Sequence, residues 1–231
     1  MLTRDFLLNA DCKTAFGVIE ESLLWSVEQR AASLAATLAC RPDNGPVWIF
    51  GYGSLMWNPA LEYDESCTGT LIGWHRAFCL RLTAGRGTAH QPGRMLALKK
   101  GGRTTGVAYK LPEHSLEEEL TLLWKREMIT GCYLPRWCSL TLDDGRTVNA
   151  LVFIMDPCHP QYESDTSAQT IAPLIAAASG PLGSNAQYLF LLERELIRLG
   201  MRDDSLNDLL ENVRQLADEN RQKGEPDAGF S

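Results

Sequence analysis

A glycine-rich loop is the first group of residues whose types and spacing could do chemistry. The loop Gly51-Tyr52-Gly53-Ser54-Leu55-Met56 directly follows an apolar run at 47–50. Two glycines around one residue allow a tight turn with consecutive N–H groups, which suits an anion or an oxyanion, although such turns are also common without a ligand. Met56 replaces the third glycine of a dinucleotide fingerprint. Ser54 has no recognisable His–Asp pair, so we do not expect a serine nucleophile.

Glu127 is the candidate for proton transfer. Leu120 and Leu123 precede it by seven and four residues, so helical spacing places its carboxylate on an apolar stripe. A carboxylate in that position costs free energy unless it is paired or takes part in chemistry. The alternative is an ion pair at the helix end with Lys125, Arg126 or a more distant arginine.

Arg76 lies between Trp74 and Phe78 on the apolar face of a predicted strand. It could bind a substrate carboxylate through two parallel hydrogen bonds, pair with Glu127, or stack on Trp74. The sequence leaves these alternatives open. Three tyrosines could donate hydrogen bonds to a substrate or simply pack in the core: Tyr109, Tyr133 and Tyr188.

The elements that must position these residues read as an α+β fold around a bent or closed sheet. A helical stripe covers 16–40, and a helix that His114-Ser115 can cap carries Glu117 to Glu127. Asp143-Asp144-Gly145-Arg146 predicts a hairpin turn. Strands are predicted at 47–50, 68–82 (long, or interrupted by a bulge), 95–98, 105–111, 137–142 and 148–155, and C-terminal helices at 170–178, 186–199 and 205–220. Many short strands with little regular alternation of strand and helix favour this class over a doubly wound sheet.

Composition excludes several classes of function. The chain has 231 residues, 22 basic and 29 acidic, with a net charge of −7, and 45% of its residues are hydrophobic. An acidic chain without a basic cluster is a poor nucleic-acid binder. Its apolar runs are far shorter than the ~18 residues of a membrane span, and Asp5 comes too early for a signal peptide. We therefore predict a cytoplasmic protein that binds neither nucleic acid nor a membrane.

The seven cysteines support a reducing compartment. Their number is odd and no Cys-x-x-Cys pair occurs, so we predict reduced thiols rather than a disulfide framework. Cys158-His159 is the best candidate for a metal-ligand pair and has no matching second pair. We predict no metal and no organic cofactor.

The loop resembles the signature of the gamma-glutamylcyclotransferase superfamily, and the wider pattern resembles its ChaC branch. The matching pieces follow the family's order over about residues 47 to 200, which one glycine motif could not do by chance. Besides the loop, they are His75-Arg76-Ala77-Phe78, Pro92-Gly93-Arg94, Gly106 to Leu111, Lys125-Arg126-Glu127, Gly131-Cys132-Tyr133, and Gly180-Pro181 through Asn185 to Phe190.

The resemblance implies a compact α+β fold, a small and mostly antiparallel β-barrel with surrounding helices. It implies that glutathione is split into 5-oxoproline and cysteinylglycine, with the family's acidic catalytic residue mapping onto Glu127. The glycine loop would hold the gamma-glutamyl group, and Arg76, Tyr133 and Tyr188 complete the expected substrate-binding set. The expected organisation is a helical extension over 1–45, the cyclotransferase-like domain over 46–222 and a flexible tail over 223–231.

Two other functions fit the same residues. The loop and Glu127 could act on other gamma-glutamyl amines or amino acids. Alternatively, the protein could be a non-catalytic binder or thiol sensor that uses the loop and an exposed cysteine. A pure binder, however, would have no reason to place an unpaired carboxylate on a core stripe.

Overall fold

The computed structural model describes residues 3–9 and 16–222, which form two compact units. Strands β2 and β3 contribute residues to both units. The first unit takes 3–9, 20–76 and 97–157 of the described chain, and the second takes 16–19, 77–96 and 158–222. The predicted boundary at residue 45 stays a prediction, and the predicted tail over 223–231 lies outside the described residues.

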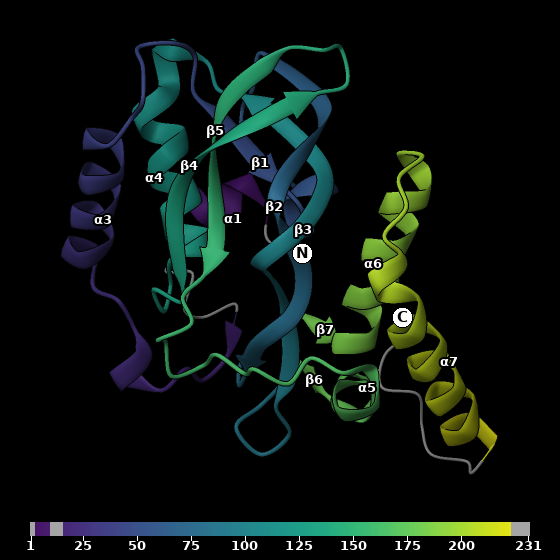
Figure 1. The fold of residues 1–231 in the computed structure, drawn as a ribbon. Helices are drawn as coiled ribbons and strands as arrows, with labels where there is room; N and C mark the ends of the chain where they lie inside the picture. Colours follow the sequence, from purple (N-terminus) through teal and green to yellow (C-terminus); the bar gives the residue numbers. More distant parts are fainter. Residues whose placement is uncertain (1–2, 10–15, 223–231) are drawn as a thin grey trace. The chain divides into compact units, whose positions relative to one another are not determined.

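Five strands form a closed barrel in the order β1-β3-β2-β4-β5 (Figure 1). Strand β1 pairs antiparallel with β3 and parallel with β5, whereas β2 with β4 and β4 with β5 pair antiparallel. The bounds are β1 Trp48–Gly51, β2 Glu65–Leu82, β3 Gly93–Lys110, β4 Tyr133–Leu142 and β5 Thr147–Met155. The predicted fold, a small and mostly antiparallel barrel with helices, is confirmed.

The strands nearest the candidate site are buried over most of their length. All four residues of β1 are buried, as are the last six residues of β5. Strands buried on both faces appear in a sequence as continuous apolar runs rather than as alternating patterns. This is why the runs 47–50 and 151–155 were recognisable as strands, and the turn at Gly145 joins β4 to β5 as predicted.

Two strand predictions need correction. The segments 95–98 and 105–111 belong to one continuous strand, β3, which passes through Gly101 and Gly102 with φ of 108° and 67°. Alternation over 68–82 predicts that Ile72 and Phe78 share one apolar face. In the structure Ile72 is 67% exposed, because the inward side of β2 changes near Gly73, where φ is 88°. Only glycine adopts such angles easily, so the strands bend there without ending.

The first unit also contains the helices α1 Arg4–Asn9, α3 Val27–Ala39 and α4 Leu116–Glu127, and α3 lies beside α4 (Figure 1). The predicted helix over 16–40 is therefore too long at its start. Ser26 and Gln29 form a reciprocal capping box that fixes the beginning of α3 at Val27. Ser115 precedes α4 but makes no side-chain cap, because a 3₁₀ turn, η3 Glu113–Ser115, leads into that helix. The described residues of this unit also form two other 3₁₀ turns, η1 Glu21–Leu23 and η2 Ser54–Met56.

The second unit is largely helical. It contains α5 Ala168–Ala177, α6 Asn185–Arg198, α7 Asn207–Gln222, the turn η4 Asp204–Leu206 and the two-residue strands β6 Ser179–Gly180 and β7 Gly183–Ser184. The three predicted C-terminal helices are confirmed within two residues at each end. Among the described helices, none has the length and apolar character needed to cross a membrane.

Candidate active site

The glycine loop leaves β1 and closes into the 3₁₀ turn η2. The turn's hydrogen bonding begins with Met56, whose N–H donates to the Gly53 carbonyl at 2.9 Å. The Asn58 N–H then donates to the Ser54 carbonyl at 2.9 Å. The N–H groups of Ser54 and Leu55 precede the first of these bonds, so the turn itself does not use them. Of the predicted N–H donors, Met56 is thereby committed to the turn.

Side chains from the barrel hold the loop carbonyls. The Arg76 Nε donates to the Tyr52 carbonyl at 2.7 Å, and the Tyr109 hydroxyl donates to the carbonyls of Leu55 at 2.9 Å and Met56 at 3.2 Å. In a planar trans peptide the C=O and the following N–H point in opposite directions. The contact with Tyr52 therefore turns the Gly53 N–H away from the Arg76 side chain.

Arg76 lies behind the loop and is only 3% exposed. One terminal nitrogen of its guanidinium donates to the Thr105 carbonyl and also contacts the Met56 sulfur at 3.7 Å. These contacts tie strands β2 and β3 to the loop. They support a bracing role for Arg76, and its predicted binding of a substrate carboxylate stays a prediction.

Gly51 is the loop glycine at which a side chain would not fit. A Cβ there would lie 2.9 Å from the Leu55 Cβ, 3.3 Å from the Leu55 carbonyl carbon and 3.4 Å from the Tyr109 ring. Gly53 has φ of −133°, so the tight turn does not rely on a left-handed conformation at that residue. The requirement for glycine is thus clearest at Gly51, where the loop folds back on the strand that carries it.

Arg126 connects Glu127 to the loop. Its Nε lies 2.9 Å from the Glu127 Oε1, and one terminal nitrogen donates to the Ser54 hydroxyl at 3.0 Å. The other terminal nitrogen donates to the carbonyls of Asn58 at 2.6 Å and Pro59 at 3.1 Å. One guanidinium therefore binds the Glu127 carboxylate, the first residue of the η2 turn and the chain that follows the turn. The ion pair at the helix end, considered above as the alternative for Glu127, is therefore present with Arg126. The same arginine also contacts the predicted site through Ser54.

Glu127 ends α4 with 17% of its side chain exposed. Burial raises the pKa of the Glu127 carboxyl above its ordinary value, while the charge and hydrogen bond of Arg126 act in the opposite direction. Burial is the larger effect. The result is a carboxylate that is more basic than an ordinary glutamate and is held at one oxygen by Arg126.

Phe153 of β5 contacts two tyrosines of the predicted site, Tyr52 of the loop and Tyr133, and it also contacts α4. The Tyr52 hydroxyl donates to the Phe153 carbonyl at 2.6 Å. The Tyr133 ring lies 6.2 Å from the Phe153 ring, edge to face, and Trp124 of α4 packs on the same ring at 5.2 Å. A series of direct contacts thus joins residues 51–56, Arg76, Glu127 and Tyr133 within the first unit.

Tyr188 belongs to the second unit. It is buried in α6, edge to face with Phe78 at 6.3 Å, and the Arg86 guanidinium lies 5.8 Å from its ring centre. These contacts account for its burial within that unit. Its predicted substrate contact stays a prediction.

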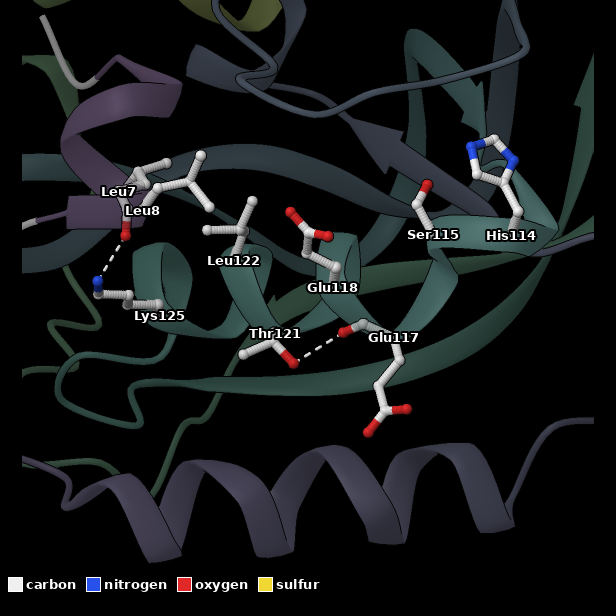
Figure 2. A pocket seen from close by; sticks show the side chains of 9 residues that line it. All are labelled: Leu7, Leu8, His114, Ser115, Glu117, Glu118, Thr121, Leu122 and Lys125. Atoms are coloured by element: carbon white, nitrogen blue, oxygen red, sulfur yellow. Dashed lines mark hydrogen bonds between the residues drawn. The ribbon is translucent and has the colours of Figure 1, made fainter.

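A pocket of about 570 Å³ opens between α1 and the outer side of α4 (Figure 2). Leu7 and Leu8 line it from α1, and Leu122 and Lys125 line it from α4. None of the residues that line it belongs to the predicted site. It is therefore distinct from the loop and Glu127.

Sequence reasoning missed the part that Arg126 plays at the loop. A signal was present, because Arg126 follows the fully buried Leu123 by three residues, which places both side chains on the inner side of α4. Phe153 carried no comparable signal, since an aromatic residue in a buried strand is ordinary core.

No cluster of three metal-ligating side chains occurs in the described parts of the chain. The six cysteines within these parts form no disulfide: Cys40, Cys67, Cys79, Cys132, Cys138 and Cys158. The absence of a metal stays a prediction, which a chelation experiment can test.

Comparison with known proteins gives concordant results. The sequence profile of a family described as ChaC-like protein matches residues 47–216. A protein of Escherichia coli (strain K12) named glutathione-specific gamma-glutamylcyclotransferase is 82% identical over 231 residues, 100% of both chains. Human glutathione-specific gamma-glutamylcyclotransferase 1 is 34% identical over 158 residues, covering 66% of this chain and 71% of the human protein. The crystal structure of a yeast gamma-glutamyl cyclotransferase specific to glutathione shares the fold, with a TM-score of 0.69 at 24% identity, covering 74% of this chain and 97% of that one.

Proposed function

The chain belongs to the ChaC-like protein family, and we propose that it is a glutathione-specific gamma-glutamylcyclotransferase. It cleaves reduced glutathione into 5-oxoproline and cysteinylglycine. The observation that carries this proposal is the identity to the Escherichia coli enzyme over the whole of both chains. Action in the cytoplasm stays a prediction, which the lack of disulfides among the cysteines of the described residues supports.

The reaction needs little from the protein, because the substrate carries its own nucleophile. The α-amine of the gamma-glutamyl group attacks its own γ-carbonyl and closes a five-membered ring. The bond from the γ-carbon to the cysteine nitrogen breaks, and a proton moves from the attacking nitrogen to the leaving amine. No water and no redox partner enter the balance. The protein must hold the α-amine against the γ-carbonyl, move the proton, and stabilise the oxyanion, which is the negative charge that develops on the γ-carbonyl oxygen.

We infer that Glu127 moves the proton. An ordinary glutamate has a pKa near ~4.3, and an α-ammonium group has a pKa near ~8. Proton transfer from the substrate's ammonium group to such a glutamate is therefore unfavourable by roughly 5 kcal/mol. Burial raises the pKa of Glu127 and reduces that difference. Arg126 engages Oε1, so Oε2 is the oxygen we assign to the substrate amine. The same carboxyl would then return the proton to the cysteinylglycine amine.

We propose the loop N–H groups of Gly53, Ser54 and Leu55 as the oxyanion donors. Their directions are fixed in advance, because the preceding carbonyls are already held: Tyr52 by Arg76, Gly53 by the Met56 N–H and Ser54 by the Asn58 N–H. Donors that are oriented before the substrate binds need no reorganisation during the reaction. Arg76 is a positioning residue in this mechanism.

The proton-transfer assignment predicts a pH effect of Arg126→Gln. Glu127 must be deprotonated to act as a base, and the positive charge of Arg126 favours that form. Without the charge, burial acts alone and the pKa of Glu127 rises further, so the acid limb of the kcat/KM profile should move to higher pH. Arg126→Lys is the matched control, because it keeps the charge and should leave the limb near its original position. Identical limbs in wild type and Arg126→Gln would contradict the assignment.

The function is tested by incubating purified protein with reduced glutathione and detecting 5-oxoproline and cysteinylglycine by mass spectrometry. Gamma-glutamylamines and free gamma-glutamyl amino acids are assayed beside it, and faster turnover of one of these would contradict glutathione specificity. Variants with each cysteine replaced by serine should keep the activity, whereas a thiol sensor would lose its response.

Exhaustive EDTA treatment and dialysis should leave the activity of the same preparation unchanged, because the nucleophile is internal to the substrate. Loss of turnover that zinc or magnesium restores would refute this mechanism.

A further inference from the structure

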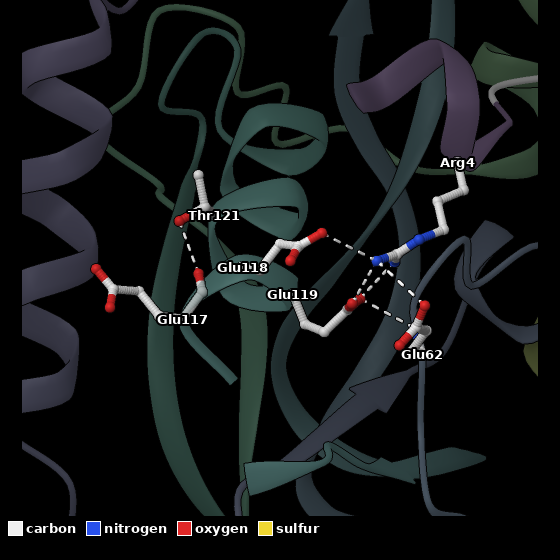
Figure 3. Close-up of polar contacts among 6 residues, drawn as sticks. All are labelled: Arg4, Glu62, Glu117, Glu118, Glu119 and Thr121. Atoms are coloured by element: carbon white, nitrogen blue, oxygen red, sulfur yellow. Dashed lines mark hydrogen bonds and ion pairs between the residues drawn. The ribbon is translucent and has the colours of Figure 1, made fainter. Parts of the chain in front are cut away.

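Residues that precede the barrel hold α4 at its first turn. Arg4 of α1 donates to both oxygens of Glu119, at 2.7 and 2.6 Å, and the Glu119 side chain has no exposed surface (Figure 3). The same carboxylate accepts the backbone N–H of Glu62 at 2.9 Å. A buried carboxylate needs such partners, because its charge would otherwise be strongly unfavourable. α1 is therefore fastened to the helix that ends at Glu127.

The same part of the chain also contacts the other end of α4. The Trp25 N–H donates to the Ile129 carbonyl at 2.9 Å, two residues beyond Glu127. The Trp25 ring lies directly on Gly131, which has φ of 65°, and a Cβ at that glycine would lie 1.9 Å from the Trp25 Cε2. The ring thus occupies the space that any side chain at residue 131 would need.

Trp25 is itself held in place from α3. The Arg30 guanidinium donates to the Trp25 carbonyl at 2.7 Å, and Ser26, the next residue, caps the helix. Further along α3, the Ser33 hydroxyl accepts the Trp124 indole N–H at 3.2 Å. Trp25 therefore contacts the turn after Glu127 from the start of α3, a helix that is itself packed on α4.

We infer that residues 3–9 and 20–39, which precede the barrel, position the catalytic carboxylate, and that Trp25 is the residue through which they fix the turn from Glu127 to Tyr133. The last turn of a helix leaves carbonyls without partners inside the helix, so the position of a carboxylate there depends on how the next residues are held. Trp25 binds a backbone carbonyl and covers a glycine in this turn. It is a positioning residue, and the inference rests on the proposed role of Glu127.

The test compares Trp25→Ala with Trp25→Phe and with a matched control, Trp137→Phe. Trp137 anchors the same segment elsewhere, since its indole N–H donates to the Thr37 carbonyl at 2.8 Å. We expect Trp25→Ala to lower kcat on glutathione about tenfold with KM changed less than about twofold, because a displaced carboxylate slows the reaction more than it weakens binding. Trp25→Phe should recover most of the rate, and Trp137→Phe should affect Tm but not kcat.

A second comparison keeps the inference falsifiable if Trp25→Ala is poorly folded. Gly131→Ala should lower kcat in the wild-type background and cause a smaller further loss in the Trp25→Phe or Trp25→Ala background, because the clash partner is then smaller or absent. The inference would be overturned if Gly131→Ala lowered kcat by the same factor in the wild-type and the Trp25-variant backgrounds. It would also be overturned if Trp25→Ala and Trp137→Phe had equal kcat. Failure of the proposed function would show separately, as absence of 5-oxoproline with the wild-type protein or as full activity of Glu127→Gln.

Discussion

Glu127→Gln should lower kcat on glutathione by at least about 100-fold while the protein remains folded, the usual size of a general-base effect. Glutamine has the same shape and keeps an oxygen that can accept the 2.9 Å contact from Arg126, but it has no basicity in the relevant range. Because burial already makes this carboxyl a stronger base than usual, its removal should cost more than the loss of a solvated glutamate. Steady-state kinetics measure the loss of kcat, and the circular dichroism spectrum shows whether the variant remains folded.

Glu117→Gln is the matched control. Glu117 lies in the first turn of the same helix, is exposed and lines the outer pocket rather than the predicted site. Its replacement should leave kcat within about twofold of wild type, as expected for an exposed surface carboxylate. Turnover close to normal in Glu127→Gln would remove Glu127 from the mechanism and leave the proton acceptor to be found elsewhere.

Gly51→Ala should lower kcat/KM about 100-fold or more. The new methyl group would approach the Leu55 Cβ to 2.9 Å and the Leu55 carbonyl carbon to 3.3 Å, and backbone atoms cannot move aside as a side-chain end can. The loop would have to shift, and with it the N–H groups assigned to the oxyanion. Loss of a single oxyanion donor costs about 2.7–4 kcal/mol, which corresponds to the predicted factor. Kinetics at several glutathione concentrations measure the effect.

Gly45→Ala provides the control for the added methyl group. Its Cβ would lie 2.8 Å from the Asp43 carboxylate, the end of an exposed side chain that can move but would weaken its hydrogen bonds from the Gly45 N–H and the Asn149 amide. We expect activity close to wild type and a small decrease in Tm in that variant. If Gly51→Ala were equally harmless, the loop would not be the rigid donor array proposed here.

Patterns within short stretches of sequence predicted those elements of the fold that depend mainly on neighbouring residues in the chain. The buried strands, the hairpin at Gly145 and the C-terminal helices follow from apolar runs, turn chemistry and helical spacing, and the structure confirms them. The same reasoning divided β3 at its glycines, because glycine usually marks an end of a strand. Pairing with two neighbouring strands keeps β3 continuous, and that is a tertiary effect.

The sequence indicates the residue types of the candidate site but not the contacts between them. The glycine loop and Glu127 stand out in the sequence, whereas Arg76 was equally compatible with a substrate carboxylate, Glu127 or Trp74. Its actual partners include the carbonyls of Tyr52 and Thr105, which carry no sequence signal because every residue has a carbonyl. For the same reason, the bond from Trp25 to the Ile129 carbonyl could not be anticipated.

Strand β1 both closes the barrel and carries the glycine loop, and this has a consequence for the order of folding. Trp48 pairs with Lys110 on one side and with Ala150 on the other, so both pairings join residues distant in the chain. Contacts of this kind are expected to form late, because bringing distant residues together costs loop-closure entropy before the contact stabilises the fold. The loop acquires its holding contacts from Arg76 and Tyr109 only when β1 is in place. Recovery of activity during refolding should therefore coincide with closure of the barrel, and a separation of β1 from β5 would abolish turnover before the helices unfold.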